Sequence, residues 1–314
     1  MRMRVGGWVV QTLAAAGMFF SLHSSYAKTE PVAKKAPAAA TKAPVAKAPM
    51  AKARSHHPRG PEIRSNSVLV IDESDSSVLL SKNADVAVPI ASITKLMTAL
   101  VVLEADQPLD EAIKITNDDR NIDRNAPSRL PVGASLSRAE LLHLALMSSE
   151  NRAANALGRS YPGGTKGVLA AMNAKAKALG MKRTHFKDTT GLSEGNIASP
   201  ADLTKLVMAA SAHPTIRKYS TDPEEVVTVG RYPVEYHNTN NLVRKADWDI
   251  VVQKTGYTQA AGRCLVMKAV INDHPVVMVL MNSYGKYTRT ADAVRVRRWM
   301  ESAVPATSLA RAGK

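Results

Sequence analysis

Two apolar runs near the C-terminal end, Cys264-Leu-Val-Met-Lys-Ala-Val-Ile271 and Pro275-Val-Val-Met-Val-Leu-Met281, decide the fold. The short polar segment Asn272-Asp-His274 separates them, and this arrangement is typical of a tight β-hairpin. A third apolar run, Ile250-Val-Val-Gln-Lys254, precedes the pair. The sequence therefore predicts that the C-terminal third of the chain returns to β-strands.

A second hairpin is predicted farther upstream, where the runs 67–72 and 77–81 flank the polar residues 73–76. Helical patterns fill the space between the two hairpins, and another helix closes the domain. The predicted helices are 93–104, 137–147 with a capping box at Ser137-Arg-Ala-Glu140, 166–179 ending before Gly180, one opened by Ser199-Pro200, and 290–300. Strands at both ends with helices between them predict one α+β domain: an antiparallel β-sheet flanked by helices, with an inserted helical region.

The chain has 314 residues and a formal net charge of +15, which raises the question of a nucleic-acid partner. Residues 1–60 carry ten Lys and Arg against one acid, Glu30, so +9 of this charge lies before the domain and +6 within the rest. Aromatic residues make up only 4% of the chain, too few for a base-stacking surface. The single Cys excludes a disulfide framework and a Cys-based zinc site. We therefore expect no nucleic-acid partner.

The N-terminal segment has the layout of a secretory signal peptide. Arg2 and Arg4 precede the largely apolar stretch 5–22, and Ser25-Tyr-Ala27 supplies a small-residue cleavage site. An uncleaved membrane anchor is the alternative, which Gln11, Thr12 and Gly6-Gly7 weaken because they interrupt the apolar run. We assign 1–27 as the signal peptide and expect export to the periplasm, without a stable membrane anchor.

Residues 28–61 are almost entirely Ala, Lys and Pro, a composition that cannot form a packed core. We interpret them as a disordered linker, with a cationic tether that touches an anionic envelope surface as the alternative. The domain is assigned to residues 62–304 and a flexible tail to 305–314.

Ser92-Ile-Thr-Lys95 stands where a loop enters the predicted helix 93–104. Residues three apart share one helix face, so the Lys95 amine can reach the Ser92 hydroxyl and activate it as a nucleophile. We expect that neighbouring cations are needed to lower the pKa of Lys95 enough for the amine to act as a neutral base. The same spacing occurs at Ser25–Lys28 and Ser283–Lys286, but neither of these lies in a helical context.

Two further motifs strengthen this interpretation. Ser149-Glu-Asn151 follows the Leu-rich helix, where a hydroxyl can relay a proton and an amide can hold a substrate carbonyl. Lys254-Thr-Gly256 ends an apolar strand, where Lys and Thr can bind a carboxylate and Gly lets a substrate lie against the strand. The order Ser-x-x-Lys, Ser-x-Asn, Lys-Thr-Gly is the pattern of penicillin-recognising serine enzymes.

On these motifs the chain resembles the low-molecular-mass penicillin-binding proteins, the D-alanyl-D-alanine carboxypeptidases and periplasmic endopeptidases. The resemblance spans residues 65–303. It also rests on Ile90-Ala-Ser-Ile-Thr-Lys-Leu-Met-Thr98, Leu146-Met-Ser-Ser-Glu-Asn-Arg-Ala-Ala154, Thr189-Thr-Gly-Leu192, Lys254-Thr-Gly-Tyr257 and Ala261-Gly262. Glu150 departs from the Gly or Asp that commonly stands at its position.

The resemblance implies a β-lactamase/transpeptidase-like fold and assigns the roles of the site. The nucleophile is Ser92, its base Lys95 and the proton relay Ser149. The substrate-binding residues are Asn151, Lys254, Thr255 and Gly256, and the oxyanion is held by the backbone N–H groups of Ser92 and Tyr257.

The resemblance also implies the partners, which are peptidoglycan peptide stems and β-lactam antibiotics as covalent inhibitors. No cofactor and no metal are expected. Because the chain ends soon after its last predicted helix, we favour a soluble endopeptidase that cuts D-Ala–diaminopimelate cross-links.

Three alternatives remain open. A carboxypeptidase of the same family has the same motifs. A class A β-lactamase needs a Glu that positions the deacylating water, for which the candidate is Glu194. A non-catalytic cell-wall-binding module is the third. Two further interpretations concern single positions: Cys264 is expected to be a buried structural thiol, and the polar loop 237–241 is placed near the cleft without an assigned role.

Overall fold

The computed structural model describes residues 60–120 and 128–303, and its centre is a five-stranded antiparallel sheet. The strand order is β2-β1-β11-β10-β9, so the first and last strands of the domain lie side by side, with Ser67 opposite Met281. This confirms the predicted α+β fold with one shared sheet. The strands are β1 (Ser67–Asp72), β2 (Val78–Lys82), β9 (Asp249–Thr258), β10 (Gly262–Ile271) and β11 (His274–Ser283).

The turn of the β10–β11 hairpin consists of two residues. Asn272 and Asp273 have φ angles of 50° and 64°, both in the left-handed region that a tight type I′ turn requires. His274 pairs with Ile271 in the ladder, so it belongs to the strand and not to the predicted turn.

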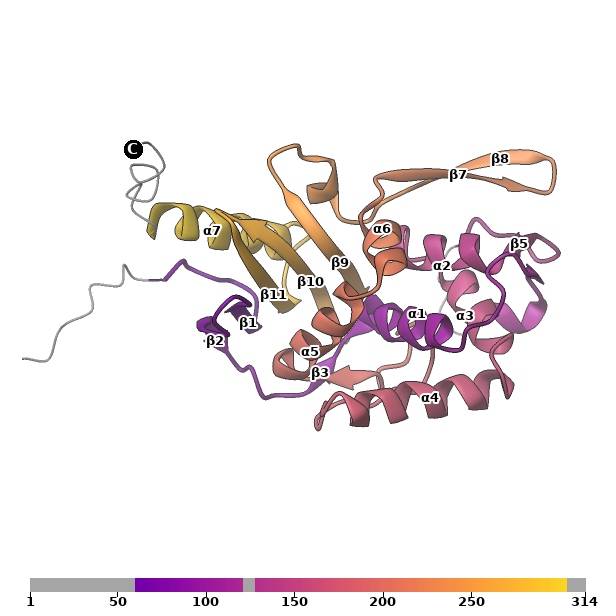
Figure 1. Cartoon of the computed structure of the whole chain (residues 1–314), viewed down its shortest axis with the longest axis horizontal. Helices are drawn as coiled ribbons and strands as arrows, with labels where there is room; N and C mark the ends of the chain where they lie inside the picture. The colour runs from indigo at the N-terminus through magenta and orange to yellow at the C-terminus, as the bar shows by residue number, and fades with distance from the viewer. Residues whose placement is uncertain (1–59, 121–127, 304–314) are drawn as a thin grey trace, which may run out of the picture. The chain divides into compact units, whose positions relative to one another are not determined.

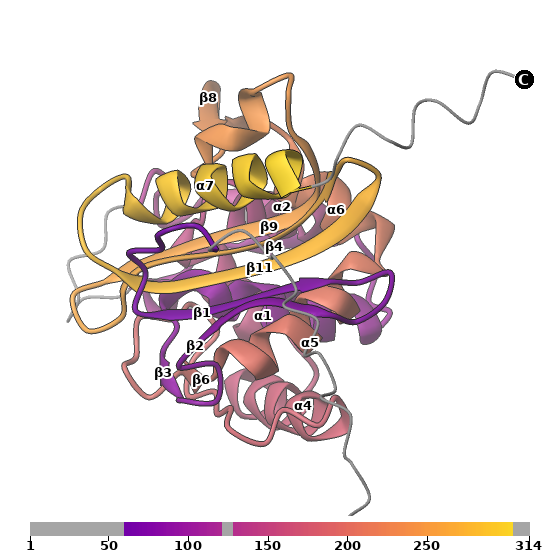
Figure 2. The same ribbon diagram turned by 90° about the vertical axis from the view of Figure 1, so that its left-hand side faces the viewer.

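The sheet is buried on both faces, which explains why its central strands read as continuous apolar runs. In β11, Val277 and Val279 pack into the core shared with the helical region, while Val276 and Met278 pack against the opposite cluster. That second cluster includes residues of α7 (Thr288–Ala303). Figure 2 shows α7 along one face of the sheet and the other helices beyond the opposite face.

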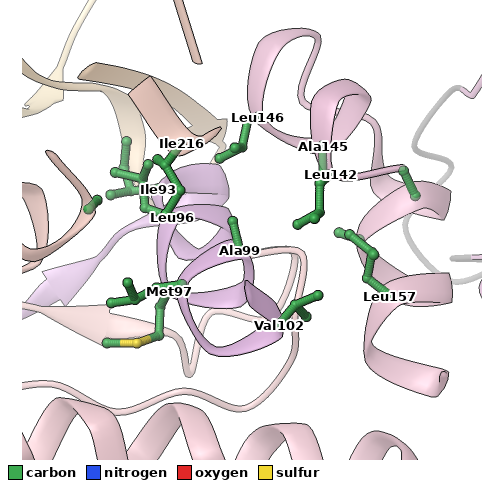
Figure 3. Packing of buried hydrophobic residues seen from close by; sticks show 14 of the residues in the cluster. Ile93, Leu96, Met97, Ala99, Val102, Leu142, Ala145, Leu146, Leu157 and Ile216 are labelled. Atoms are coloured by element: carbon green, nitrogen blue, oxygen red, sulfur yellow. The ribbon is translucent and has the colours of Figure 1, made fainter. Parts of the chain in front are cut away.

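The inserted helical region is built around α1 (Thr94–Glu104). Every residue of α1 from Thr94 to Val102 is buried, so this part of the helix has no face exposed to solvent. Leu96 and Ala99 of α1 lie near Leu142, Leu146 and Ile216 from surrounding helices (Figure 3). The surrounding helices are α2 (Arg138–Met147), α3 (Asn151–Arg159), α4 (Gly164–Ala178), α5 (Pro200–Ser211) and α6 (Pro214–Thr221).

The helix boundaries follow the sequence signals closely. Ser137 forms the predicted capping box with Glu140 at the start of α2, and Ser199 accepts the backbone N–H of Asp202 at the start of α5. Helix α4 ends just before Gly180, whose φ of 67° is the left-handed conformation expected after a helix. Local capping chemistry was therefore enough to place these helices.

One hairpin was not predicted. Strands β7 (Glu224–Val229) and β8 (Tyr232–His237) pair with each other and extend away from the rest of the domain (Figure 1). The remaining short elements are β3 (Val88–Pro89) with β6 (Ile197–Ala198), β4 (Ala112–Lys114) with β5 (Ser135–Ser137), and the 3-10 turns η1 (Ala91–Ile93), η2 (Asn117–Asp119) and η4 (Asn241–Arg244).

The predicted signal peptide 1–27, nearly all of the linker 28–61 and the tail 305–314 lie outside the described residues. Within the described part of the chain, no helix has the length and apolar character that a membrane crossing requires.

Candidate active site

Ser92 occupies the short turn η1, directly before α1 begins at Thr94. The preceding residue, Ala91, has a φ of 47°, a strained conformation for a residue with a side chain. Thr94 stabilises this turn because its hydroxyl donates to the Ala91 carbonyl at 2.8 Å. The nucleophile candidate is therefore held on a tight, locally bonded entry to the central helix, as its motif predicts.

Lys95 connects three parts of the site through its ammonium group. Its Nζ donates to Ser92 Oγ at 2.9 Å, to Asn151 Oδ1 at 2.8 Å and to the Thr190 carbonyl at 2.7 Å. These three bonds use all three of its protons, and the side chain is only 1% exposed. The structure thus brings residues of the first two predicted motifs together.

Burial lowers the pKa of Lys95 to about 7, against the opposing pull of the Asp188 and Glu150 carboxylates. The expectation that neighbouring cations must lower this pKa was wrong, because loss of solvent around the ammonium is the dominant cause. A pKa of about 7 lets a substantial fraction of the amine be neutral near neutral pH, as a general base requires.

The second motif forms the turn between α2 and α3. Asn151 is the first residue of α3, and Glu150 caps that helix by accepting the backbone N–H of Arg152. Glu150 is 7% exposed, so this departure from the common Gly or Asp is accommodated as a helix cap.

Ser149, in the same turn, has a φ of 62°, and its side chain is half-buried. The structure records no hydrogen bond of its hydroxyl with residues 60–120 or 128–303.

The third motif lies within β9, the strand at one edge of the sheet. Lys254 is fully buried, and its Nζ donates to the Thr255 carbonyl at 3.1 Å. Burial first, then the charges of Lys95 and Arg289, hold the pKa of Lys254 well below its usual range. A Cβ at Gly256 would lie 3.1 Å from the Ser92 nitrogen and 2.9 Å from the Ile90 carbonyl oxygen. Glycine is therefore required there, because the strand edge lies directly against the nucleophile.

One missed residue adds a further cation to this edge. Arg289, on α7, donates from Nη1 to the Gly256 carbonyl at 3.3 Å. Burial and the nearby Arg263 charge lower the pKa of Arg289. No local pattern in the sequence singles out this residue, because it approaches β9 only through the tertiary fold.

The loop 188–193 lies against Lys95 and is held in shape by Asp188. Part of this loop, Thr189–Leu192, was named from the sequence only in support of the family resemblance and was given no role. The Asp188 carboxylate accepts the backbone N–H groups of Thr190, Gly191 and Ser193. Gly191 has a φ of 86°, and a Cβ there would lie 1.9 Å from the Ala91 carbonyl oxygen. The loop therefore fits tightly against the nucleophile turn and fixes the Thr190 carbonyl that Lys95 uses.

Thr239 joins the two walls of the site. Its backbone N–H donates to the Met147 carbonyl at the end of α2, and its hydroxyl lies 2.6 Å from that of Thr255. The polar loop 237–241, for which no role was assigned, thus contacts the site directly through one residue.

Other predicted features lie outside this constellation. Ser283 ends β11, and its hydroxyl lies 2.8 Å from that of Ser65, so Ser283–Lys286 is not a second nucleophile motif. Cys264 is fully buried, as expected, and pairs with Gly256 across the ladder. Among the described residues, Glu224, Glu235 and His237 are near enough to one another to share a cation, but all three are exposed on the β7–β8 hairpin.

Comparisons with known proteins agree with this geometry. The profile of peptidase S11, described as D-alanyl-D-alanine carboxypeptidase, matches residues 52–285. The chain is 47% identical over 259 residues to a D-alanyl-D-alanine endopeptidase of Pseudomonas aeruginosa, covering 81% of this chain and 84% of that protein. It is also 47% identical over 255 residues to a D-alanyl-D-alanine endopeptidase of Escherichia coli, covering 79% and 82%.

Among solved structures, the Streptomyces K15 DD-transpeptidase superimposes with a TM-score of 0.72 at 26% identity, covering 77% of this chain and 99% of that one. This match confirms the predicted transpeptidase-like fold. Taken with the site built around Ser92 and Lys95, the family match shows that the chain belongs to the D-alanyl-D-alanine carboxypeptidase family of serine peptidases, peptidase S11.

Proposed function

We propose that this protein is a periplasmic endopeptidase that cleaves D-Ala-containing peptide cross-links of peptidoglycan through a Ser92 acyl-enzyme. The observation that carries the proposal is the Lys95 ammonium, which bonds Ser92 Oγ and Asn151 Oδ1 at 2.9 and 2.8 Å inside a buried site. In this arrangement the Lys95 nitrogen is the base, and it contacts both the nucleophile and the amide that positions substrate.

Acylation begins with the neutral form of Lys95. Its amine takes the proton of Ser92 as Oγ attacks the D-Ala carbonyl carbon, and the carbonyl oxygen becomes an oxyanion. The backbone N–H groups of Ser92 and Tyr257 stabilise that oxyanion. Gly256 supports this role because it lies against the Ser92 nitrogen and so holds the next residue close to the nucleophile.

Collapse of the tetrahedral intermediate breaks the amide C–N bond and leaves D-Ala esterified to Ser92. The leaving amine needs a proton, which passes from Lys95 directly or through the Ser149 hydroxyl. Water then hydrolyses the ester, releases the D-Ala carboxylate and restores the Ser92 hydroxyl.

Substrate is held between the strand edge and the α2–α3 turn. Asn151 positions a substrate carbonyl, and Lys254 with Thr255 anchors the carboxylate of the residue that leaves. Arg289, which is half-buried, adds a positive charge at the Gly256 carbonyl. β-Lactam antibiotics place a carboxylate and a strained amide in the same positions, so they acylate Ser92 as covalent inhibitors.

The relatives favour endopeptidase over carboxypeptidase activity. The two relatives at 47% identity are named endopeptidases, whereas a carboxypeptidase of Mycobacterium tuberculosis is 31% identical over 231 residues. The N-terminal signal layout, within residues 1–27, supports a periplasmic location.

The activity is tested with defined cross-linked and uncross-linked muropeptides whose products are read by mass. We expect the dimer to be split faster than the free pentapeptide loses its terminal D-Ala, and Ser92→Ala to abolish both reactions. Preferential loss of terminal D-Ala would assign carboxypeptidase activity, and rapid turnover of penicillin would assign a β-lactamase. Unchanged cleavage by Ser92→Ala would overturn the acyl-enzyme altogether.

A further inference from the structure

An exposed aromatic ring and a cation stand directly beside the nucleophile. Tyr257 follows Gly256, which packs against the Ser92 nitrogen, and its side chain is 55% exposed. Arg263 pairs with Tyr257 across the β9–β10 ladder, and its guanidinium lies 4.3 Å from the centre of the Tyr257 ring. Stacking on the ring fixes the guanidinium plane and leaves its edge N–H groups available to a ligand.

No acidic side chain in the described part of the chain neutralises Arg263. Within residues 60–120 and 128–303 the structure records no ion pair for Arg263, and its charge acts on the like-charged Arg289. Elsewhere on the same strand a cation is neutralised, since Lys268 of β10 pairs with Glu73. Two guanidinium groups beside the site that form no ion pair with the described residues favour an anionic ligand.

The adjoining loop extends this surface. Arg263 also pairs with Ser283, the last residue of β11, so the loop after β11 begins beside it. Two tyrosines of that loop, Tyr284 and Tyr287, are 80% and 66% exposed, and Lys286 lies over the Tyr287 ring. Aromatic faces interleaved with cations suit an extended ligand that carries carboxylates, and charge complementarity therefore points to an acidic peptide.

The direction of β9 shows which part of the substrate reaches this surface. Lys254 and Thr255 precede Gly256, and Tyr257 follows it, so they lie on opposite sides of the nucleophile contact. In the proposed function, Lys254 and Thr255 bind the carboxylate of the leaving residue. The acyl-donor stem therefore runs past Tyr257, and the residue before its D-Ala comes opposite Arg263.

We propose that Arg263, stacked on Tyr257, forms a subsite for a free side-chain carboxylate on the residue that precedes D-Ala in the acyl-donor stem. This inference rests on the proposed function, because it uses the orientation of substrate given there. The subsite makes the enzyme prefer donor stems in which that carboxylate is ionised over stems in which it is amidated.

The test compares two synthetic cross-linked dimers that differ only in whether this donor carboxyl is free or amidated. We expect the unaltered enzyme to prefer the free carboxylate about tenfold in kcat/KM, the size of one partly exposed charge-assisted contact. Arg263→Gln should remove the preference, mainly by slowing cleavage of the free-carboxylate dimer. Arg231→Gln, which removes an exposed charge at the turn between β7 and β8, should keep it.

Acylation by benzylpenicillin separates the subsite from the reaction itself, because the acyl side chain of this antibiotic bears no carboxylate. Arg263→Gln should be acylated at the rate of the unaltered enzyme. A preference that persists in Arg263→Gln overturns the subsite, as does a parallel fall in penicillin acylation and in cleavage of both dimers. If the unaltered enzyme is acylated by penicillin yet splits neither dimer, the proposed endopeptidase function fails first and the subsite falls with it.

Discussion

The site has a helical wall, which carries Lys95 on α1, and a strand wall, which carries Lys254 on β9, and the two lysines have different surroundings. On the helical wall, Lys95 has three oxygen acceptors from three separate segments, and burial lowers its pKa to about 7. On the strand wall, Lys254 is equally buried, but among the residues that the structure describes its Nζ donates to a single carbonyl, that of Thr255. A buried ammonium with one acceptor is costly unless an anion completes its surroundings. We therefore propose that the helical wall is assembled before substrate binds, and that a carboxylate of the substrate completes the strand wall.

Removing the helical base should have the largest effect. We expect Lys95→Ala to slow acylation by benzylpenicillin at least about a thousandfold, because the base and nucleophile act as one unit. Stopped-flow acylation measures the rate. Lys177→Ala, which removes an exposed lysine of α4, is the control and should leave the rate unchanged. Acylation of Lys95→Ala at a near-normal rate would assign the base to another group.

The second-largest effect is expected when β9, the strand wall, is displaced from Ser92. Gly256→Ala places a Cβ about 2.9 Å from the Ile90 carbonyl oxygen, so β9 must move away from Ser92. We expect acylation to fall about a hundredfold, because oxyanion geometry is lost when a donor shifts. Gly195→Ala is the matched control, since its Cβ would meet only the flexible Lys187 side chain. Full activity in Gly256→Ala would show that the close packing is dispensable.

The pH dependence of acylation should report the protonation state of Lys95. The neutral fraction of an amine with a pKa of about 7 rises about tenfold from about pH 6 to about pH 8. Because the base must be neutral to accept the Ser92 proton, the acylation rate should rise with pH through about 7 and then level off. A rate that does not change over this range would contradict Lys95 as the titrating base.

The smallest effect is expected at the bridge between the walls. Thr239→Val keeps the shape of the side chain but removes the hydroxyl that lies 2.6 Å from that of Thr255. We expect KM for the cross-linked dimer to rise about fivefold with little change in kcat, a loss typical of one neutral hydrogen bond. Thr239→Ser should restore most of the affinity. A fall in kcat alone would show that Thr239 does not act through substrate binding.

Local patterns predicted the parts of the molecule that local physics determines. The i, i+3 spacing brought Ser92 to Lys95, the capping box placed the start of α2, and the N-cap Ser199 placed the start of α5. The apolar runs of β10 and β11 were recognisable because both faces of these strands are buried. The β7–β8 hairpin escaped prediction because most of its side chains are exposed, so it carries no sustained apolar pattern.

The rest of the site depends on contacts between distant segments. Arg289 reaches β9 only because α7 lies across the sheet, and its sequence neighbours carry no motif. The low pKa of Lys95 comes from burial, which no motif specifies, so the cause inferred from the sequence was wrong although the base was identified. Thr239 likewise acts through contacts with Thr255 and with the Met147 carbonyl, which lie in other segments. Asp188 forms local bonds within its own loop, but the fold places that loop against the Ala91 carbonyl.

The most direct test of the account is the site of the covalent penicillin adduct. The full protein is incubated with benzylpenicillin, digested, and mapped by mass. We predict a single adduct on the peptide that contains Ser92, stable enough to isolate and absent from Ser92→Ala. An adduct that persists in Ser92→Ala, or one that maps to another serine such as Ser149 or Ser283, would contradict the account.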